Sequence, residues 1–132
     1  MIRNTTSRRR NILPVKILKL DEVEAKEILG GPIKVMFTSE TAGTKHLRFS
    51  VGYFDENQGL DLHIHPESEE VYYVIEGRGT VYTGEEKSKT EVDRNMAVYI
   101  PPGTIHGIRN TGRGKLIVAF MVAPGKEPSQ KV

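Results

Sequence analysis

Two histidines, His63 and His65, stand two positions apart in an alternating segment and are the first candidates for chemistry in this chain. Residues 60–65 read Leu-Asp-Leu-His-Ile-His, so apolar and polar side chains alternate. In a strand this period of two places both imidazoles on one face, roughly 6.5 Å apart. Two rings placed in this way can converge on a single ion. Three candidate carboxylate ligands follow in the next turn: Glu67, Glu69 and Glu70.

Taken alone, the same segment fits a surface hairpin with two solvated histidines and an acidic turn equally well. A third imidazole, His106, follows a Pro-Pro-Gly turn at residues 101–103. The prolines stiffen the chain just before the histidine, which lowers the conformational entropy that a metal ligand loses on binding. The downstream segment therefore favours an ion site over the solvated hairpin.

The chain has 132 residues and no cysteine. Its length predicts one domain with a core of its own. Without cysteine there is no disulfide framework, no thiolate metal site and no cysteine nucleophile. Any metal must be held by nitrogen and oxygen ligands.

Together the two segments resemble the two sequence motifs of the cupin superfamily. The first family motif has a His-x-His pair, a glutamate and a closing glycine, at the spacing of His63, His65, Glu70 and Gly77. The second has Pro-x-Gly, a histidine and an asparagine, at the spacing of Pro101, Gly103, His106 and Asn110. Asparagine replaces the opening glycine of both motifs, at Asn57 and Asn95. Because asparagine tolerates a positive φ better than other non-glycine residues, we expect both turns to survive.

The resemblance implies a small jelly-roll barrel that binds one divalent transition metal: Mn, Fe, Ni, Co or Zn. It implies the ligands His63, His65, Glu70 and His106, and it makes Glu67 and Glu69 turn residues. Strand parity agrees, because Glu70 shares a face with Tyr72 and Val74.

The elements that must position these residues are nearly all strands. Alternating or β-branched runs predict strands at residues 33–38, 45–54, 60–65, 70–75, 80–83, 96–100, 105–110 and 115–122. Short strands separated by Gly, Pro and Asn turns predict an all-β sandwich or barrel. Residues 12–20 predict an edge strand, and Asp21 begins a short helix of about two turns that ends at Gly30. We therefore expect an N-terminal arm, edge strand and helix in residues 1–31, the barrel in 32–124, and a loose polar tail in 125–132.

Two further residues are candidates for catalysis. Arg48 either holds a substrate anion from the barrel wall or belongs to an outward polar face opposite Leu47, Phe49 and Val51, and the alternation favours the outward face. Tyr72 either donates a proton or fills the barrel, and we expect core packing.

Charge and hydropathy bound the partners. The first 20 residues carry six Lys or Arg and no acid, although the whole chain has a net charge of only +2. No aromatic residue accompanies Arg8, Arg9 and Arg10, and no nucleic-acid motif follows, so we expect no nucleic-acid partner. No run is apolar enough to span a membrane and no secretory pattern is present, which predicts a cytoplasmic protein without a membrane partner. We expect a homodimer in which the N-terminal arm packs on the partner subunit.

The open coordination positions of such a metal predict an enzyme acting on a small oxygen-rich molecule, such as a sugar, uronate or organic acid. The reaction could be an isomerisation, elimination, decarboxylation or dioxygenation, because the motifs do not distinguish these. The alternative is a non-catalytic module that binds a sugar or another small molecule. A third alternative is a structural protein that keeps the fold with an inactive site. The complete set of ligands argues against it.

Overall fold

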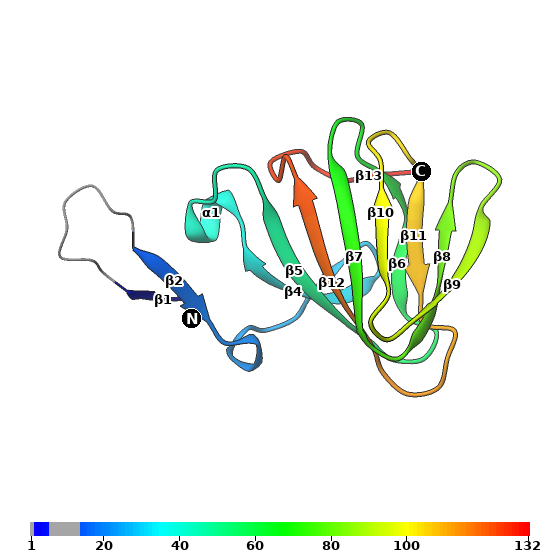
Figure 1. Ribbon diagram of the computed structural model, residues 1–132, viewed down its shortest axis with the longest axis horizontal. Coiled ribbons are helices and arrows are strands. Elements are labelled where there is room, and N and C mark those ends of the chain that lie inside the picture. The colour runs from blue at the N-terminus through cyan, green and yellow to red at the C-terminus, as the bar shows by residue number, and fades with distance from the viewer. Residues whose placement is uncertain (1, 6–13) are drawn as a thin grey trace.

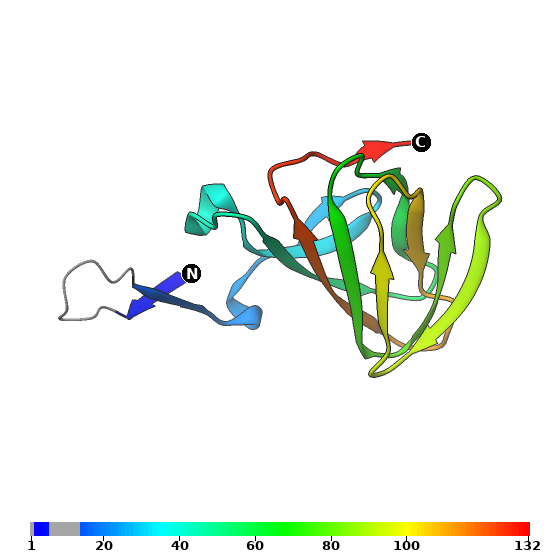
Figure 2. The ribbon, with the colours of Figure 1, turned by 45° about the horizontal axis from the view of Figure 1, so that its top comes forward.

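Two antiparallel sheets face each other in the computed structural model, which describes residues 2–5 and 14–132 (Figures 1 and 2). The larger sheet has six strands in the spatial order β10 (Ala97–Ile100), β7 (Glu69–Glu76), β12 (Leu116–Ala123), β5 (Arg48–Phe54), β4 (Gly31–Phe37) and β3 (Lys26–Ile28). The smaller sheet has five, in the order β13 (Gln130–Lys131), β6 (Gly59–Ile64), β11 (His106–Arg109), β8 (Arg78–Thr83) and β9 (Ser88–Asp93). The all-β jelly-roll prediction is confirmed.

Strand alternation explains how the two sheets enclose the core. On β12 the side chains of Leu116, Val118 and Phe120 are 0%, 0% and 3% exposed, whereas Met121 on the opposite face is 43% exposed. Tyr72 and Val74 of β7 are both 0% exposed and belong to the same core cluster. The inward face of each strand therefore packs between the sheets, where the site also lies.

A second apolar cluster covers part of the outer face of the larger sheet. Met36, Val51 and Ala119 are buried there, and Phe49 packs against them. Leu18 of the N-terminal strand β2 contacts the same cluster. The outer face of β5 is therefore apolar, which leaves the inward face for the polar residues of that strand.

Both asparagines that replace motif glycines adopt the left-handed conformation, with φ of +69° at Asn57 and +70° at Asn95. The expectation that asparagine preserves these turns is confirmed. Gly77, which closes the first motif, has φ of +90°, and a Cβ at that position would lie 2.1 Å from the carbonyl oxygen of Lys115. The first motif therefore ends where no side chain fits.

The N-terminal region differs from its prediction. The expected two-turn helix from Asp21 is a single 3-10 turn, η1 (Leu20–Glu22), and the chain then enters β3, which pairs with β4. Residues 26–28 form backbone hydrogen bonds with β4 across the Gly30 turn. This pairing stabilises a strand more than the helix propensity of the nearby glutamates stabilises a short helix. A short helix occurs instead at α1 (Ser39–Ala42), where Thr38 caps the first turn through its side chain.

The first strand also lies elsewhere than predicted. Within the predicted segment 12–20, β2 (Val15–Leu18) pairs with β1 (Ile2–Thr5) in a separate two-stranded ribbon that extends to one side of the barrel (Figure 1). It is therefore not an edge strand of either large sheet. Arg8, Arg9 and Arg10 fall outside the described residues.

The C-terminal segment is ordered against the barrel, so the expectation of a loose tail is wrong. β13 pairs with β6, with Lys131 opposite His63. The Glu127 carboxylate accepts hydrogen bonds from the backbone N–H groups of Glu67 and Ser68, at 2.8 to 3.0 Å. β9 was also missed, because its polar residues 88–91 are exposed on both faces and gave no alternation.

No helix in the part of the chain that the structure describes is long and apolar enough to cross a membrane.

Candidate metal centre

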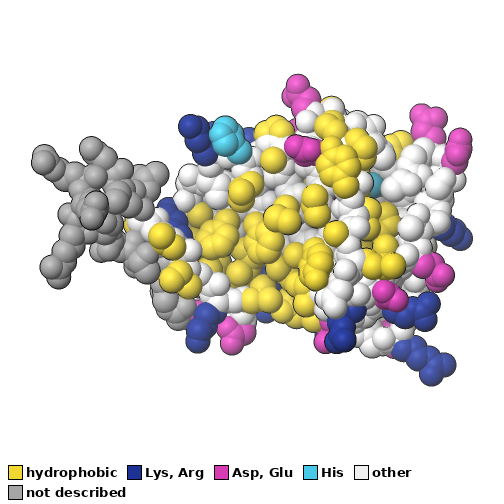
Figure 3. Space-filling model, viewed as in Figure 1, with side chains coloured by type: hydrophobic (Ala, Val, Ile, Leu, Met, Phe, Trp, Pro, Cys, Tyr) yellow, Lys and Arg dark blue, Asp and Glu magenta, His cyan; other side chains and the backbone are white. Residues whose placement is uncertain are grey.

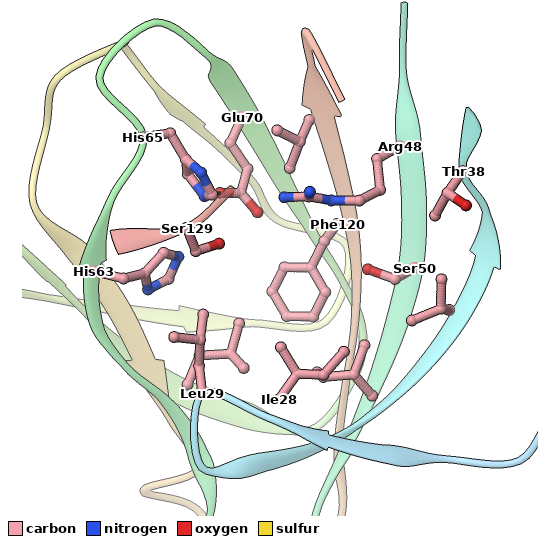
Figure 4. Close-up of a pocket in the computed structure, with 14 residues that line it drawn as sticks. Ile28, Leu29, Thr38, Arg48, Ser50, His63, His65, Glu70, Phe120 and Ser129 are labelled. Carbon is pink, nitrogen blue, oxygen red and sulfur yellow. Dashed lines mark ion pairs between the residues drawn. The ribbon is translucent and has the colours of Figure 1, made fainter. Parts of the chain in front are cut away.

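Four buried side chains, predicted from the two motifs, meet at one end of the space between the sheets. His63 lies near the end of β6, and His65 follows that strand. Glu70 lies near the start of β7 and His106 at the start of β11. Each is at most 4% exposed, and one ligand atom from each lies within 4.8 Å of the others. Figure 4 shows the side chains of His63, His65 and Glu70 pointing into a common cavity.

Strand pairing brings the two motifs together. His106 lies directly opposite His63 in the β6–β11 pair, with ring centroids 4.2 Å apart. A register shift follows at once, between His106 and Ile108. Glu70 belongs to the other sheet, where it pairs with Val122 of β12. The cluster therefore spans both sheets.

Backbone carbonyls orient two of the imidazoles. The Nδ1 atom of His63 lies 2.7 Å from the carbonyl oxygen of Asp61, and Nδ1 of His106 lies 2.7 Å from that of Thr104. A carbonyl oxygen only accepts hydrogen bonds, so Nδ1 carries the proton and the lone pair of the neutral ring is on Nε2. Metal-binding histidines in proteins are held by the same kind of contact.

This tautomer creates an unsatisfied contact at Glu70. The Nε2 atom of His106 lies 2.9 Å from Oε1 of Glu70, and Nε2 of His65 lies 3.3 Å from the same oxygen. If the His106 ring is neutral, its lone pair faces a carboxylate oxygen, and only a proton or a cation between them makes that approach favourable. The donor set therefore fits a bound cation.

The protonation states suit metal binding. Burial, together with the neighbouring His106, lowers the pKa of His63 to about 4, so this ring is neutral at pH 7. Burial alone would raise the pKa of Glu70, but hydrogen bonds donated by protonated Nε2 atoms of His106 and His65 outweigh burial and hold that pKa below its ordinary value. A cation in place of those protons would stabilise the ionised carboxylate in the same way. Neutral imidazoles and an ionised carboxylate are the forms that bind a metal.

The other two acids lie outside the cluster. Glu67 is exposed, and its backbone N–H donates to Glu127. Glu69 is exposed and accepts a hydrogen bond of 2.9 Å from the hydroxyl of Tyr99. Glu67 lies in the bend before β7, as the motif spacing implied, but the prediction is wrong for Glu69, which is the first residue of β7 and pairs with Ala123.

Arg48 lies inside the barrel, so the favoured prediction of an outward polar face is wrong. The residue lines a cavity of about 220 Å³ that also contains His63, His65 and Glu70 (Figure 4). Ser50, two positions along β5, lines the same cavity. Phe49, Val51 and Tyr53 of β5 belong to the second cluster on the outer face. The sequence of one strand does not show which of its faces other elements cover.

Tyr72 packs in the core as expected. It is 0% exposed, and its ring meets that of Phe120 edge-on at 4.9 Å between centroids. Its ring centroid lies 6.0 Å from that of His106. Burial and the negative charge of Glu70 raise the pKa of Tyr72 well above its ordinary value. Its hydroxyl has no hydrogen-bond partner among the described residues.

Several lining residues had no signal in the sequence. Ser129 reaches the cavity from the C-terminal segment, and Thr38 from the end of β4. Apolar residues line much of the remainder, including Leu29, Leu60 and Phe120. The pairing of β13 with β6 and the hydrogen bonds of Glu127 with the backbone of Glu67 and Ser68 hold the segment that contains Ser129. The polar sequence of the tail does not predict these long-range contacts.

Comparison with known proteins agrees with the fold and the cluster. The family described as Cupin domain (Cupin_2) matches residues 52–123, more than half of the chain and both motifs. The chain belongs to the cupin family. The uncharacterised protein MJ1618 of Methanocaldococcus jannaschii is 49% identical over 51 residues, which are 39% of this chain and 39% of that protein. This cupin thus matches well under half of that relative's length.

Two other relatives have names that state an activity. The polyketide synthase CurC of Streptomyces cyaneus is 27% identical to this cupin over 109 residues, covering 83% of this chain and 70% of that protein. The crystal structure of a predicted oxalate decarboxylase from Thermotoga maritima has a TM-score of 0.71 and 19% identity, covering 81% of this chain and 97% of that chain. At that identity the likeness shows the fold alone.

Proposed function

We propose that this cupin is a metal-dependent enzyme that holds one divalent transition metal through His63, His65, Glu70 and His106 and acts on a small oxygen-bearing molecule. The convergence of three buried imidazoles and one buried carboxylate beside a cavity supports the proposal. When bound, such a metal polarises a carbonyl, lowers the pKa of a water or orients a substrate. Three nitrogen ligands and one oxygen ligand leave open positions in a six-coordinate ion.

The chain's own residues would prepare the site. The carbonyls of Asp61 and Thr104 hold two imidazoles with Nε2 toward the cavity. Glu70 supplies the single negative charge that partly neutralises a divalent ion. A molecule bound against the apolar lining around Phe120 would displace water, which would strengthen its electrostatic interactions with the site.

The metal is tested by its stoichiometry. The protein is expressed in medium that contains Mn, Fe, Co, Ni and Zn, and its metal content is measured after dialysis. We expect one divalent ion per chain in the wild type and a large loss in His106→Ala, because that variant lacks a ligand. His46→Ala removes an exposed histidine outside the cluster and is the matched control. Circular dichroism checks that each variant is folded, and equal metal content in wild type and His106→Ala would contradict the proposal.

Turnover is tested with each metal form against uronates, sugar phosphates, dicarboxylic acids and diketones. The name of CurC, a polyketide synthase, supports a substrate with carbonyl oxygens and does not select one reaction. Metal-dependent turnover that is lost in His106→Ala is the expected result. Absence of turnover with every metal form would count against catalysis.

A non-catalytic binding module is the second candidate, and one observation favours it. Apart from the four cluster residues, the polar side chains lining the cavity among the described residues are hydroxyls and the guanidinium of Arg48. Hydroxyls and guanidinium groups are weak general acids and bases at neutral pH, so catalysis by a general acid or base would depend on the metal. A tight ligand without turnover would support this reading.

A further inference from the structure

The guanidinium of Arg48 reaches into the cavity from β5, on the wall opposite His63 (Figure 4). Its side chain is partly buried. One nitrogen, Nη1, donates to the backbone carbonyl oxygens of Gly125 at 3.0 Å and Glu127 at 3.4 Å. Both acceptors are neutral, so these contacts do not neutralise the charge.

The other donors of Arg48 are available to a ligand. No carboxylate among the described residues forms an ion pair with it, and Nε and Nη2 have no hydrogen-bond partner there. Glu70, the carboxylate that lines the same cavity, contacts His65 and His106 instead. A partly buried cation without a counter-charge favours an anion, and the planar edge of a guanidinium matches the two oxygens of a carboxylate.

The other residues that line the cavity indicate the polarity of the rest of the ligand. Leu29, Ile33, Leu60 and Phe120 offer apolar surface beside the charged end. A polyhydroxylated molecule would need many hydrogen-bond partners. Apart from Arg48 and the metal-cluster side chains, this lining offers only the hydroxyls of Thr38, Ser50 and Ser129. The lining therefore suits a molecule with one charged end and an apolar body.

We infer that the cavity binds a carboxylic acid with an apolar body, the carboxylate paired with the free edge of Arg48 and the body against Phe120 and Leu29. The ligand lies beside the metal centre, so its role as a substrate rests on the proposed function. Its binding to Arg48 does not. Among the sugars, uronates and organic acids expected from the sequence, this selects the apolar organic acids.

The test compares three probes of different charge and polarity: benzoate, benzamide and gluconate. Each is titrated into the zinc-loaded protein, and binding is followed by calorimetry and ligand-observed NMR. Benzamide can accept a hydrogen bond from Arg48 but carries no charge, so benzoate should bind about 10-fold more tightly than benzamide. Gluconate should bind no better than benzamide, because its hydroxyls lose water in an apolar cavity. Tighter binding of gluconate than of benzoate would overturn the apolar assignment.

Variants separate the charge of Arg48 from its contact with the C-terminal segment. Arg48→Gln should abolish the preference for benzoate over benzamide, and Arg48→Lys should keep part of it. Glu127→Gln is the matched control, because the Glu127 carboxylate holds the segment on the backbone of Glu67 and Ser68, whereas Arg48 contacts only its carbonyl oxygen. We expect Glu127→Gln to keep the preference. Its loss in Glu127→Gln as much as in Arg48→Gln, or its persistence in Arg48→Gln, would overturn the inference.

Metal content and the benzoate preference are measured separately, so the two proposals can fail independently. If the wild-type protein binds no metal but still prefers benzoate in a way that depends on Arg48, the metal proposal fails and the carboxylate site stands. If metal binds at the predicted stoichiometry and benzoate shows no preference, the carboxylate site fails alone.

Discussion

The carbonyl oxygens of Asp61 and Thr104 set which imidazole nitrogen faces the cavity. Their contribution comes from the backbone, so the identity of either side chain does not reveal it. Each carbonyl belongs to a residue two positions before its histidine, and the same local arrangement occurs on β6 and before β11. Preparation of the ligands is therefore a property of chain conformation as well as of residue type.

Tyr72 allows a prediction at this scale. A buried hydroxyl without a partner costs free energy, so Tyr72→Phe should raise the free energy of unfolding of the metal-free protein by about 1 kcal/mol. Urea denaturation measures the change, and Tyr53→Phe, a substitution outside the core cluster that contains Tyr72, is the control. Lower stability in Tyr72→Phe would show that the hydroxyl finds a partner in solution. A fall in kcat without a change in KM would assign it a role in proton transfer.

The sequence predicted the cluster through its resemblance to the two cupin motifs, whose spacing selected Glu70 from three candidate acids. His63, His65, Glu70 and His106 are indeed buried together. Arg48 carried no such pattern. Its direction depends on which face of β5 is covered by other elements, and that is decided by residues far away in the chain.

At the scale of elements, the left-handed turn at Asn57 gives a matched series of substitutions. Its φ of +69° suits glycine and strains a β-branched residue. Asn57→Gly should change the free energy of unfolding by only a few tenths of a kcal/mol, whereas Asn57→Val should lower it by about 1 to 2 kcal/mol. Thermal or urea unfolding measures both. Equal stability of the two variants would mean that the turn changes conformation to suit valine.

Strands with alternating or apolar sequences were predicted nearly at their true positions, because burial on one face imposes the period of two. The predicted 115–122 is β12 (Leu116–Ala123), and 70–75 is β7 (Glu69–Glu76). β9 and β13 were missed because all their residues except Val92 are exposed, so they show no alternation and their partner strands define them. The helix from Asp21 failed for the same reason, since β4 supplies the pairing that residues 26–28 adopt.

At the scale of the whole molecule, exposed apolar side chains gather on the outer face of the larger sheet (Figure 3). This outer apolar face includes residues between 39% and 59% exposed: Leu47, Tyr73, Ile75, Tyr99 and Met121. A contiguous apolar patch on a small protein indicates a binding surface. The β1–β2 ribbon extends away from the barrel, and an isolated two-stranded ribbon is only marginally stable. We propose that a second copy of the chain covers both, in the dimer that the sequence predicts.

The dimer is tested by a charge placed in the outer apolar face. Met121→Glu should shift the protein from dimer to monomer in sedimentation or light-scattering measurements, because a buried unpaired carboxylate is unfavourable in an interface. Lys89→Glu on the exposed strand β9 changes charge away from that face and should leave the dimer intact. A monomeric wild type, or a dimer that tolerates the Met121 substitution, would contradict the proposal.

The opposition of His63 and His106 across β6 and β11 has a consequence for how the barrel keeps its alignment. A slip of β6 by one two-residue repeat would preserve the inside–outside pattern of the strand and move the two rings about 6.6 Å out of step. Hydrophobic burial alone discriminates weakly against such a slip. An ion could be bound by both strands and by Glu70 of the facing sheet only in the native register. Metal binding would therefore stabilise that register over the slipped one as the barrel folds.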